Sequence, residues 1–188
     1  MITLVGISGS LRRGSFNTAL LREAAALMPT DATLNLRTLH DIPLYDADAE
    51  AAEGIPAAVT GLQEAIASAQ GVLLATPEYN NGIPGVFKNG IDWLSRPPAD
   101  IKRIFGDKPF ALIGASPGGF GTILSQAAWL PVLRTLGTRP WFGSRLLVSR
   151  AQQVFSEQGA INDPKIREQL REFLLGFVTF VRAQTPAA

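Results

Sequence analysis

The sequence predicts an α/β fold of three layers, in which a doubly wound parallel sheet of five strands lies between helices. Short apolar runs alternate along the chain with longer stretches of helical spacing, which is typical of strand–helix–strand units. The runs 72–76 and 110–115 are almost wholly apolar, as expected of strands that helices cover on both faces. Polar, glycine-rich segments follow three of the runs, where sheets of this class bind their ligands.

The predicted strands are short and are bounded by glycine, proline or polar residues. They span residues 2–7, 33–36, 72–76, 110–115 and 145–149. Five parallel strands allow a flavodoxin-like order, 2-1-3-4-5, or a truncated Rossmann sheet.

The predicted helices lie between and after these strands. They span residues 17–27, 57–69, 85–94, 122–136 and 164–181. Phe87, Ile91 and Leu94 recur at i, i+4 and i+7, which is the spacing of one helix face. Asp163 stands before Pro164, a pair typical of an N-cap followed by proline at the first helical position.

Length and composition are those of one globular domain. The chain has 188 residues, of which 46% are hydrophobic and 18% charged, and no change of composition divides it. We therefore expect a single domain over residues 1–184, followed by a loose tail over residues 185–188. The chain opens on a strand without a basic leader, and its apolar run 173–181 is far shorter than the roughly 20 residues of a membrane span. A cytoplasmic protein without membrane insertion is expected.

Charge and residue usage argue against several classes of function. Lys plus Arg number 17 and Asp plus Glu number 16, so no strong positive field attracts nucleic acid. The chain has no cysteine, which excludes disulfides, thiolate metal ligands and a cysteine nucleophile. The single histidine, His40, argues against a His-rich metal site or a Ser-His-Asp triad, and we interpret it as structural. No metal is expected.

The segment between the first strand and the first helix, residues 9–18, is rich in glycine, hydroxyl groups and arginine. Glycine lets the backbone approach an anion, and a helix N-terminus offers free N–H groups and the positive end of the helix dipole. Neutral donors come from Ser10, Ser15, Asn17 and Thr18. This pattern favours a bound phosphate, and the alternative is a capped helix after a flexible turn, with solvated arginines.

Two known phosphate motifs do not fit this segment. A P-loop starting at Gly9 would need a Lys-Ser/Thr pair where Ser15 and Phe16 stand, so no lysine reaches a γ-phosphate. A dinucleotide fingerprint fails on the spacing of Gly6, Gly9 and Gly14. The remaining interpretation is that this segment binds a phosphate group without transferring it.

Two further loops follow the third and fourth predicted strands. In the first of them Pro77 ends the strand, and the segment 78–80 presents a carboxylate, an aromatic ring and an amide before the turn Asn81-Gly82. The other loop, residues 116–122, contains three glycines that allow backbone to lie against a ligand. In the order 2-1-3-4-5, strands one, three and four are adjacent, so all three loops would meet and hold a mononucleotide such as FMN. The alternative is a set of turns without a ligand.

Several motifs together resemble the NADPH-dependent FMN reductase family, and its bacterial quinone and chromate reductases in particular. The motifs are Gly-Ser-Leu-Arg-Arg-Gly-Ser-Phe-Asn at 9–17, Pro-Glu-Tyr-Asn at 77–80, Gly-Ile-Pro-Gly-Val-Phe-Lys-Asn at 82–89 and Asp92-Trp93. The resemblance extends over nearly the whole chain. It implies a flavodoxin-like fold, bound FMN, and a homodimer or homotetramer.

The resemblance also assigns residues to the cofactor. Around the FMN phosphate and ribityl chain it places Ser10, Arg12, Ser15, Phe16 and Asn17. Along the isoalloxazine ring it places Pro77, Glu78, Tyr79 and Asn80, with Ser116, Gly118 and Gly119 on the other side. No catalytic side chain is expected, because the flavin carries the chemistry.

The reaction that the resemblance implies is hydride transfer from NADPH or NADH to FMN, followed by two-electron reduction of a small-molecule electron acceptor. Quinones are the expected acceptors, with chromate, azo and nitro compounds as further candidates, and a ping-pong order is expected. One alternative is a flavodoxin-type electron carrier without NAD(P)H turnover, although such carriers are strongly acidic and this chain is nearly neutral. Another is a nucleotide-binding regulatory domain without a redox role.

The tryptophans are expected in the core or at subunit contacts rather than stacked on a cofactor. The aromatic residues Phe120, Trp129 and Trp141 are the expected centre of an oligomer surface, because interface cores favour such side chains.

Overall fold

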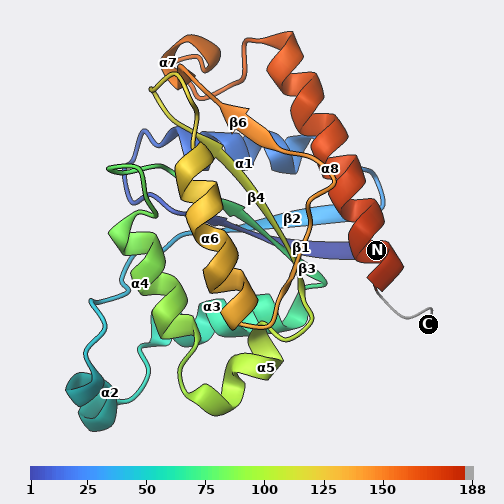
Figure 1. The fold of residues 1–188 in the computed structure, drawn as a ribbon. Coiled ribbons are helices and arrows are strands. Elements are labelled where there is room, and N and C mark those ends of the chain that lie inside the picture. Colours follow the sequence, from blue (N-terminus) through green and yellow to red (C-terminus); the bar gives the residue numbers. More distant parts are fainter. Residues whose placement is uncertain (185–188) are drawn as a thin grey trace.

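A parallel sheet of six strands runs through the molecule, in the order β2-β1-β3-β4-β5, with β6 also paired to β4. All pairings are parallel in the computed structural model, which describes residues 1–184 (Figure 1). The strands are β1 (Ile2–Ser8), β2 (Ala32–Arg37), β3 (Gly71–Ala75), β4 (Pro109–Ala115), β5 (Arg139–Pro140) and β6 (Leu146–Val148). The predicted flavodoxin-like order is confirmed, and the predicted tail at 185–188 lies outside the described residues.

The fifth position of the sheet is shared by two short strands. β5 pairs with Pro109 and Phe110 at the start of β4, and β6 pairs with residues 113–115 at its end. Residues 141–145 leave the sheet between them. The sequence predicted only the second piece, because β5 has two residues and one is a proline, which cannot donate to a ladder.

The long helices follow the predicted positions. They are α1 (Phe16–Ala26), α3 (Ala57–Ser68), α4 (Gly85–Leu94), α6 (Ile123–Thr135) and α8 (Pro164–Gln184). The structure adds short helices that the sequence did not predict: α2 (Ala47–Glu53), η1 (Pro98–Asp100), α5 (Ile101–Ile104) and α7 (Ala151–Val154). These have at most two turns, and α2 buries no residue, so neither length nor apolar spacing indicates them.

Two hydrophobic cores lie on opposite faces of the sheet, which gives the predicted three layers (Figure 1). α1 and α8 cover one face, where Leu73 of β3 and Phe177 of α8 belong to the same buried cluster. α3, α4 and α6 cover the other, where Leu74 packs in one cluster with Phe87. Because neighbouring residues of β3 point to opposite faces and both faces are covered, the whole strand is buried.

The tryptophans correct one prediction. Trp129 is fully buried, packs its ring against Phe87 and donates from Nε1 to the Thr76 hydroxyl at 3.0 Å, so it cannot form part of an oligomer surface. Its position on α6 places it against the sheet, whereas Phe120 in the loop before that helix is 83% exposed. Trp141 is half-buried against α8. Among the described residues, no helix combines the length and the apolar character needed to cross a bilayer.

Candidate cofactor site

The loops that follow β1, β3 and β4 meet at one edge of the sheet, where Figure 1 draws them in blue, green and yellow. A hollow of about 240 Å³, here called the loop hollow, lies at their junction. It is lined by Ser10, Arg12, Ser15, Phe16, Asn17, Pro77, Glu78, Tyr79, Ala115, Ser116 and Pro117. The three loops predicted to form one site therefore do come together. Asn80, Gly118 and Gly119 do not line the hollow.

The floor of the loop hollow is the N-terminus of α1. Ser15 is the N-cap, and its Oγ accepts a hydrogen bond from Thr18 N at 3.2 Å. The N–H groups of Phe16 and Asn17 have no acceptor within residues 1–184. Free N–H groups and the positive end of the helix dipole favour an anion at this position.

Asn17 connects α1 to the end of β4. Its side-chain Nδ2 donates to Ala115 O at 2.8 Å, and its Oδ1 accepts from Ala115 N at 2.9 Å. At Pro77 the neighbouring chain leaves the sheet, because proline has a fixed φ and no N–H. The Asn17 amide thus replaces a strand partner for Ala115. The backbone N–H of Asn17 has no acceptor within residues 1–184 and is left for a ligand.

Arg12 lies at the rim of the loop hollow. Its guanidinium carbon is 5.4 Å from the centre of the Phe16 ring, and its Nη2 donates to Gly14 O at 2.6 Å. Its backbone N–H donates to the buried Ser10 Oγ at 3.3 Å. The first loop is therefore held by its own hydrogen bonds, and other guanidinium N–H groups of Arg12 stay available for an anion.

The second loop is a tight turn. Tyr79 N donates to Gly82 O at 3.2 Å, and Gly82 N donates to Tyr79 O at 3.0 Å. Asn80 and Asn81 between them have φ values of 50° and 62°, in the left-handed region that asparagine tolerates best among side-chain-bearing residues. The turn places Asn80 at its tip, away from the hollow, and leaves Tyr79 51% exposed at the mouth.

Glu78 has a partner that the sequence did not indicate. Its Oε2 accepts hydrogen bonds from Leu124 N at 2.8 Å and Ser125 N at 2.9 Å, in the first turn of α6. A carboxylate at a helix N-terminus is stabilised by the free N–H groups and by the dipole. Glu78 therefore fixes the second loop to the helix that follows the third loop, while its side chain also lines the hollow.

The third loop is closed by its own contacts. The Ser116 hydroxyl donates to Gly121 O at 2.5 Å, and Arg150 N donates to Gly118 O at 3.0 Å. Gly118 and Gly119 are exposed and do not line the hollow, whereas Ser116 and Pro117 do. Sequence reasoning missed Pro117 and Ala115. Pro117 lies within residues 116–122, the loop that the sequence had already indicated. Ala115 is the last, apolar residue of β4, and nothing in the sequence marks such a residue as a ligand contact.

Comparison with known proteins identifies the family. The sequence pattern of the NADPH-dependent FMN reductases matches residues 2–153 of this chain. The chain belongs to the NADPH-dependent FMN reductase family. The predicted enzyme class, an NAD(P)H-dependent oxidoreductase that uses FMN, is thereby confirmed.

Individual proteins agree with the family assignment. This FMN reductase family member is 42% identical over 181 residues to an NAD(P)H-dependent FMN reductase of Pseudomonas aeruginosa, with 96% of each chain covered. It is 33% identical over 176 residues to a 2-hydroxy-1,4-benzoquinone reductase of a Burkholderia species, with 94% of each covered. Among solved structures, the flavoenzyme NAD(P)H:(acceptor) oxidoreductase FerB from Paracoccus denitrificans superposes with a TM-score of 0.86 at 31% identity, covering 98% of this chain and 99% of that one.

The donors of the loop hollow fit FMN. Its phosphate needs several hydrogen-bond donors, and the free N–H groups of Phe16 and Asn17, the Ser10 hydroxyl and the Arg12 guanidinium lie around one hollow. The carboxylate that lines it, Glu78, has Oε2 engaged by α6. The donor set of this FMN reductase is therefore suited to a dianion next to a flat, exposed aromatic surface.

Proposed function

We propose that this FMN-dependent NAD(P)H reductase passes two electrons to quinones, in a ping-pong reaction at the loop hollow. The observation that supports this most directly is the meeting of three polar loops over the free N-terminus of α1. The relative named as a 2-hydroxy-1,4-benzoquinone reductase supports a quinone as the acceptor. Chromate, azo and nitro compounds are further acceptors to be screened.

In this proposal each loop has a separate binding role. The first loop holds the cofactor phosphate through the N–H groups of Phe16 and Asn17, the Ser10 and Ser15 hydroxyls, and Arg12. The second and third loops hold the ring, with Pro77, Tyr79 and Ser116 in contact with it. Asn80, Gly118 and Gly119 lie outside the hollow, so we assign them to the turns that shape these loops.

The size of the hollow bears on the order of binding. At about 240 Å³ it is smaller than the pockets of roughly 300–1,000 Å³ that enclose drug-sized ligands, so it holds the phosphate end and leaves the ring at the mouth. FMN, when bound, supplies two-electron transfer from NAD(P)H to an acceptor. Tyr79 is half-exposed at the mouth, and in this proposal the donor and then the acceptor take the same position beside it, which predicts the ping-pong order.

The proposal is tested with the purified, FMN-loaded protein. Under anaerobic conditions, NADPH should bleach the flavin absorbance within seconds, and a benzoquinone should restore it. Free FMN without protein is the control, and it should show no comparable bleaching. Rates measured against both substrates should give parallel double-reciprocal lines. Bound flavin that NADPH and NADH both leave oxidised would instead indicate an electron carrier, and intersecting lines would exclude the shared position.

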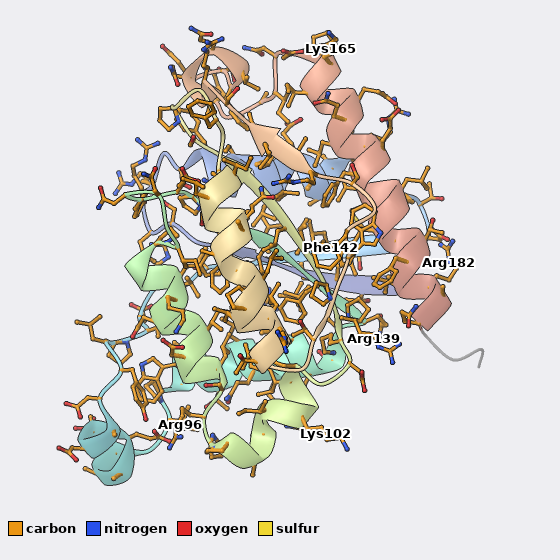
Figure 2. The ribbon with its side chains drawn as sticks, in the orientation of Figure 1. Arg96, Lys102, Arg139, Phe142, Lys165 and Arg182 are labelled. Atoms are coloured by element: carbon orange, nitrogen blue, oxygen red, sulfur yellow. The ribbon has the colours of Figure 1, made fainter. Side chains whose placement is uncertain are left out.

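We further propose that residues 1–184 form one FMN-binding domain and that the protein is a cytoplasmic homodimer or homotetramer. Phe142, on the segment between β5 and β6, is 68% exposed (Figure 2). It borders an apolar hollow of about 350 Å³ beside α6 that also includes Leu130 and Trp141. Exposed apolar surface of this kind favours contact with a second subunit. Sedimentation at micromolar concentration should give a dimer or tetramer, and a monomer would contradict the proposal.

A further inference from the structure

A second hollow lies beside the loop hollow, on the side of the first loop that faces β2. It measures about 410 Å³ and is here called the arginine hollow. It is lined by Ser10, Leu11, Arg12, Arg13, Thr18, Arg22, Thr38 and His40. Ser10 and Arg12 line both hollows, so the two are separated only by the first loop.

The arginine hollow has positive charge without a carboxylate. Within residues 1–184, Arg12, Arg13 and Arg22 form no ion pair. Six other arginines do form one: Arg96, Arg103, Arg139, Arg167, Arg171 and Arg182. Four more form none within these residues either, but they do not line this hollow: Arg37, Arg134, Arg145 and Arg150. Glu23, next to Arg22, is paired with Arg167 at 3.7 Å and does not line the hollow. Unpaired guanidinium groups around one concave surface favour an anion there.

The wall of the hollow is fixed by His40. Its Nε2 lies 3.2 Å from Leu11 O, and its Nδ1 lies 3.0 Å from the Thr38 hydroxyl. These contacts join the segment after β2 to the first loop, although the two are far apart in the sequence. The Thr18 hydroxyl is already bonded to Ser8 Oγ at 2.7 Å, so the guanidinium groups are the main donors to a ligand.

We propose that the arginine hollow binds the 2′-phosphate of NADPH and makes the enzyme prefer NADPH to NADH. This inference rests on the proposed function, because it assigns the distal end of a nucleotide whose nicotinamide reaches the loop hollow. A phosphate monoester carries up to two negative charges, and guanidinium groups bind it bidentately. NADH has a hydroxyl group in place of this phosphate and offers no charge to the arginines.

Steady-state kinetics test the assignment with a variant on α1. Arg22→Gln should raise the KM for NADPH about tenfold, as expected for the loss of a charge-assisted hydrogen bond, and should change the KM for NADH less than twofold. Arg13→Gln should act in the same direction. The matched control is Arg134→Gln, an exposed arginine in the last turn of α6 with no ion pair within residues 1–184. It should leave both KM values unchanged.

Calorimetry supplies a readout that does not depend on turnover. The FMN-loaded protein should bind 2′-phosphoadenosine 5′-diphosphate about tenfold more tightly than ADP, and Arg22→Gln should abolish the difference. Inorganic phosphate alone should compete only weakly. Equal binding of the two nucleotides, or an equal rise of both KM values in Arg22→Gln, would overturn the assignment, since the hollow would then hold the diphosphate or nothing. A protein that oxidises neither NADPH nor NADH would refute the proposed function, while the calorimetric result would still decide what the hollow binds.

Discussion

The loop hollow and the arginine hollow share two residues of the first loop, yet they are built from different kinds of groups. Around the loop hollow the polar side chains are bonded to the protein itself, as Asn17 is to Ala115 and Glu78 is to α6. Around the arginine hollow the guanidinium groups are exposed, and those of Arg13 and Arg22 have no ion pair within residues 1–184. The loop hollow is held together by hydrogen bonds between its own loops, and the arginine hollow gathers exposed positive charge.

The two hollows therefore represent two ways of binding an anion. A site made of buried hydrogen bonds is preorganised, so a change in it alters both the stability of the fold and the retention of a ligand. A site made of exposed charges costs the fold little, and its attraction is screened by salt. The following substitutions and conditions test whether the two hollows differ in this way.

The largest effect is expected for Asn17→Ala. It leaves the N–H and C=O of Ala115 without partners at a buried position, which should lower the free energy of unfolding by about 2–4 kcal/mol. FMN should be lost with the packing of α1 against β4. Chemical denaturation of the apoprotein measures the first effect. Asn35→Ala, at an exposed position of β2, is the control and should cost less than about 0.5 kcal/mol. A variant as stable as the original would show that this bridge does not preorganise the loop hollow.

A smaller effect is expected for Ser15→Ala, which removes the N-cap of α1. The free energy of unfolding should fall by about 1 kcal/mol, and the Kd for FMN should rise about tenfold because a donor to the phosphate is lost. Asp163 caps α8, where its Oδ1 accepts from Lys165 N at 2.8 Å, far along the chain from the first loop. Asp163→Ala should therefore lower stability by a similar amount without releasing FMN. If both variants released FMN equally, the effect of Ser15 would be one of stability alone.

The smallest effect is expected from salt. Between about 0.1 M and 1 M salt the screening length falls from about 10 Å to about 3 Å, so the KM for NADPH should rise about threefold. The Kd for FMN and the KM for NADH should change less, because most of the proposed phosphate donors in the loop hollow are neutral N–H and O–H groups, whereas those of the arginine hollow are charged. Titrations at several salt concentrations measure all three values. An equal change of the KM for NADPH, the KM for NADH and the Kd for FMN would show that the two hollows do not bind their anions in different ways.

The sequence already located much of the site because its signals are local. Ser15 before a helix, Pro77 at the end of an apolar run and Asn81-Gly82 at a turn act on their immediate neighbours. Alternating strands and helices then predict a parallel sheet, but they left open whether its strand order is flavodoxin-like or that of a truncated Rossmann sheet. The prediction for Trp129 was wrong because the sequence alone does not show whether an aromatic side chain on a helix packs against the sheet or against a partner subunit.

Local chemistry along the chain thus determined the long helices, most of the strands, and the three polar loops that follow β1, β3 and β4. Only the tertiary structure decided what each polar group does there. Asn17 and Ala115 are 98 positions apart, and Glu78 and Leu124 are 46 apart. The arginine hollow likewise needs His40 against Leu11, 29 positions away. A hydrogen bond requires a distance of about 3 Å between donor and acceptor, and only the packing of the helices on the sheet sets that distance. Neither the composition of the chain nor the spacing of its residues predicts these contacts.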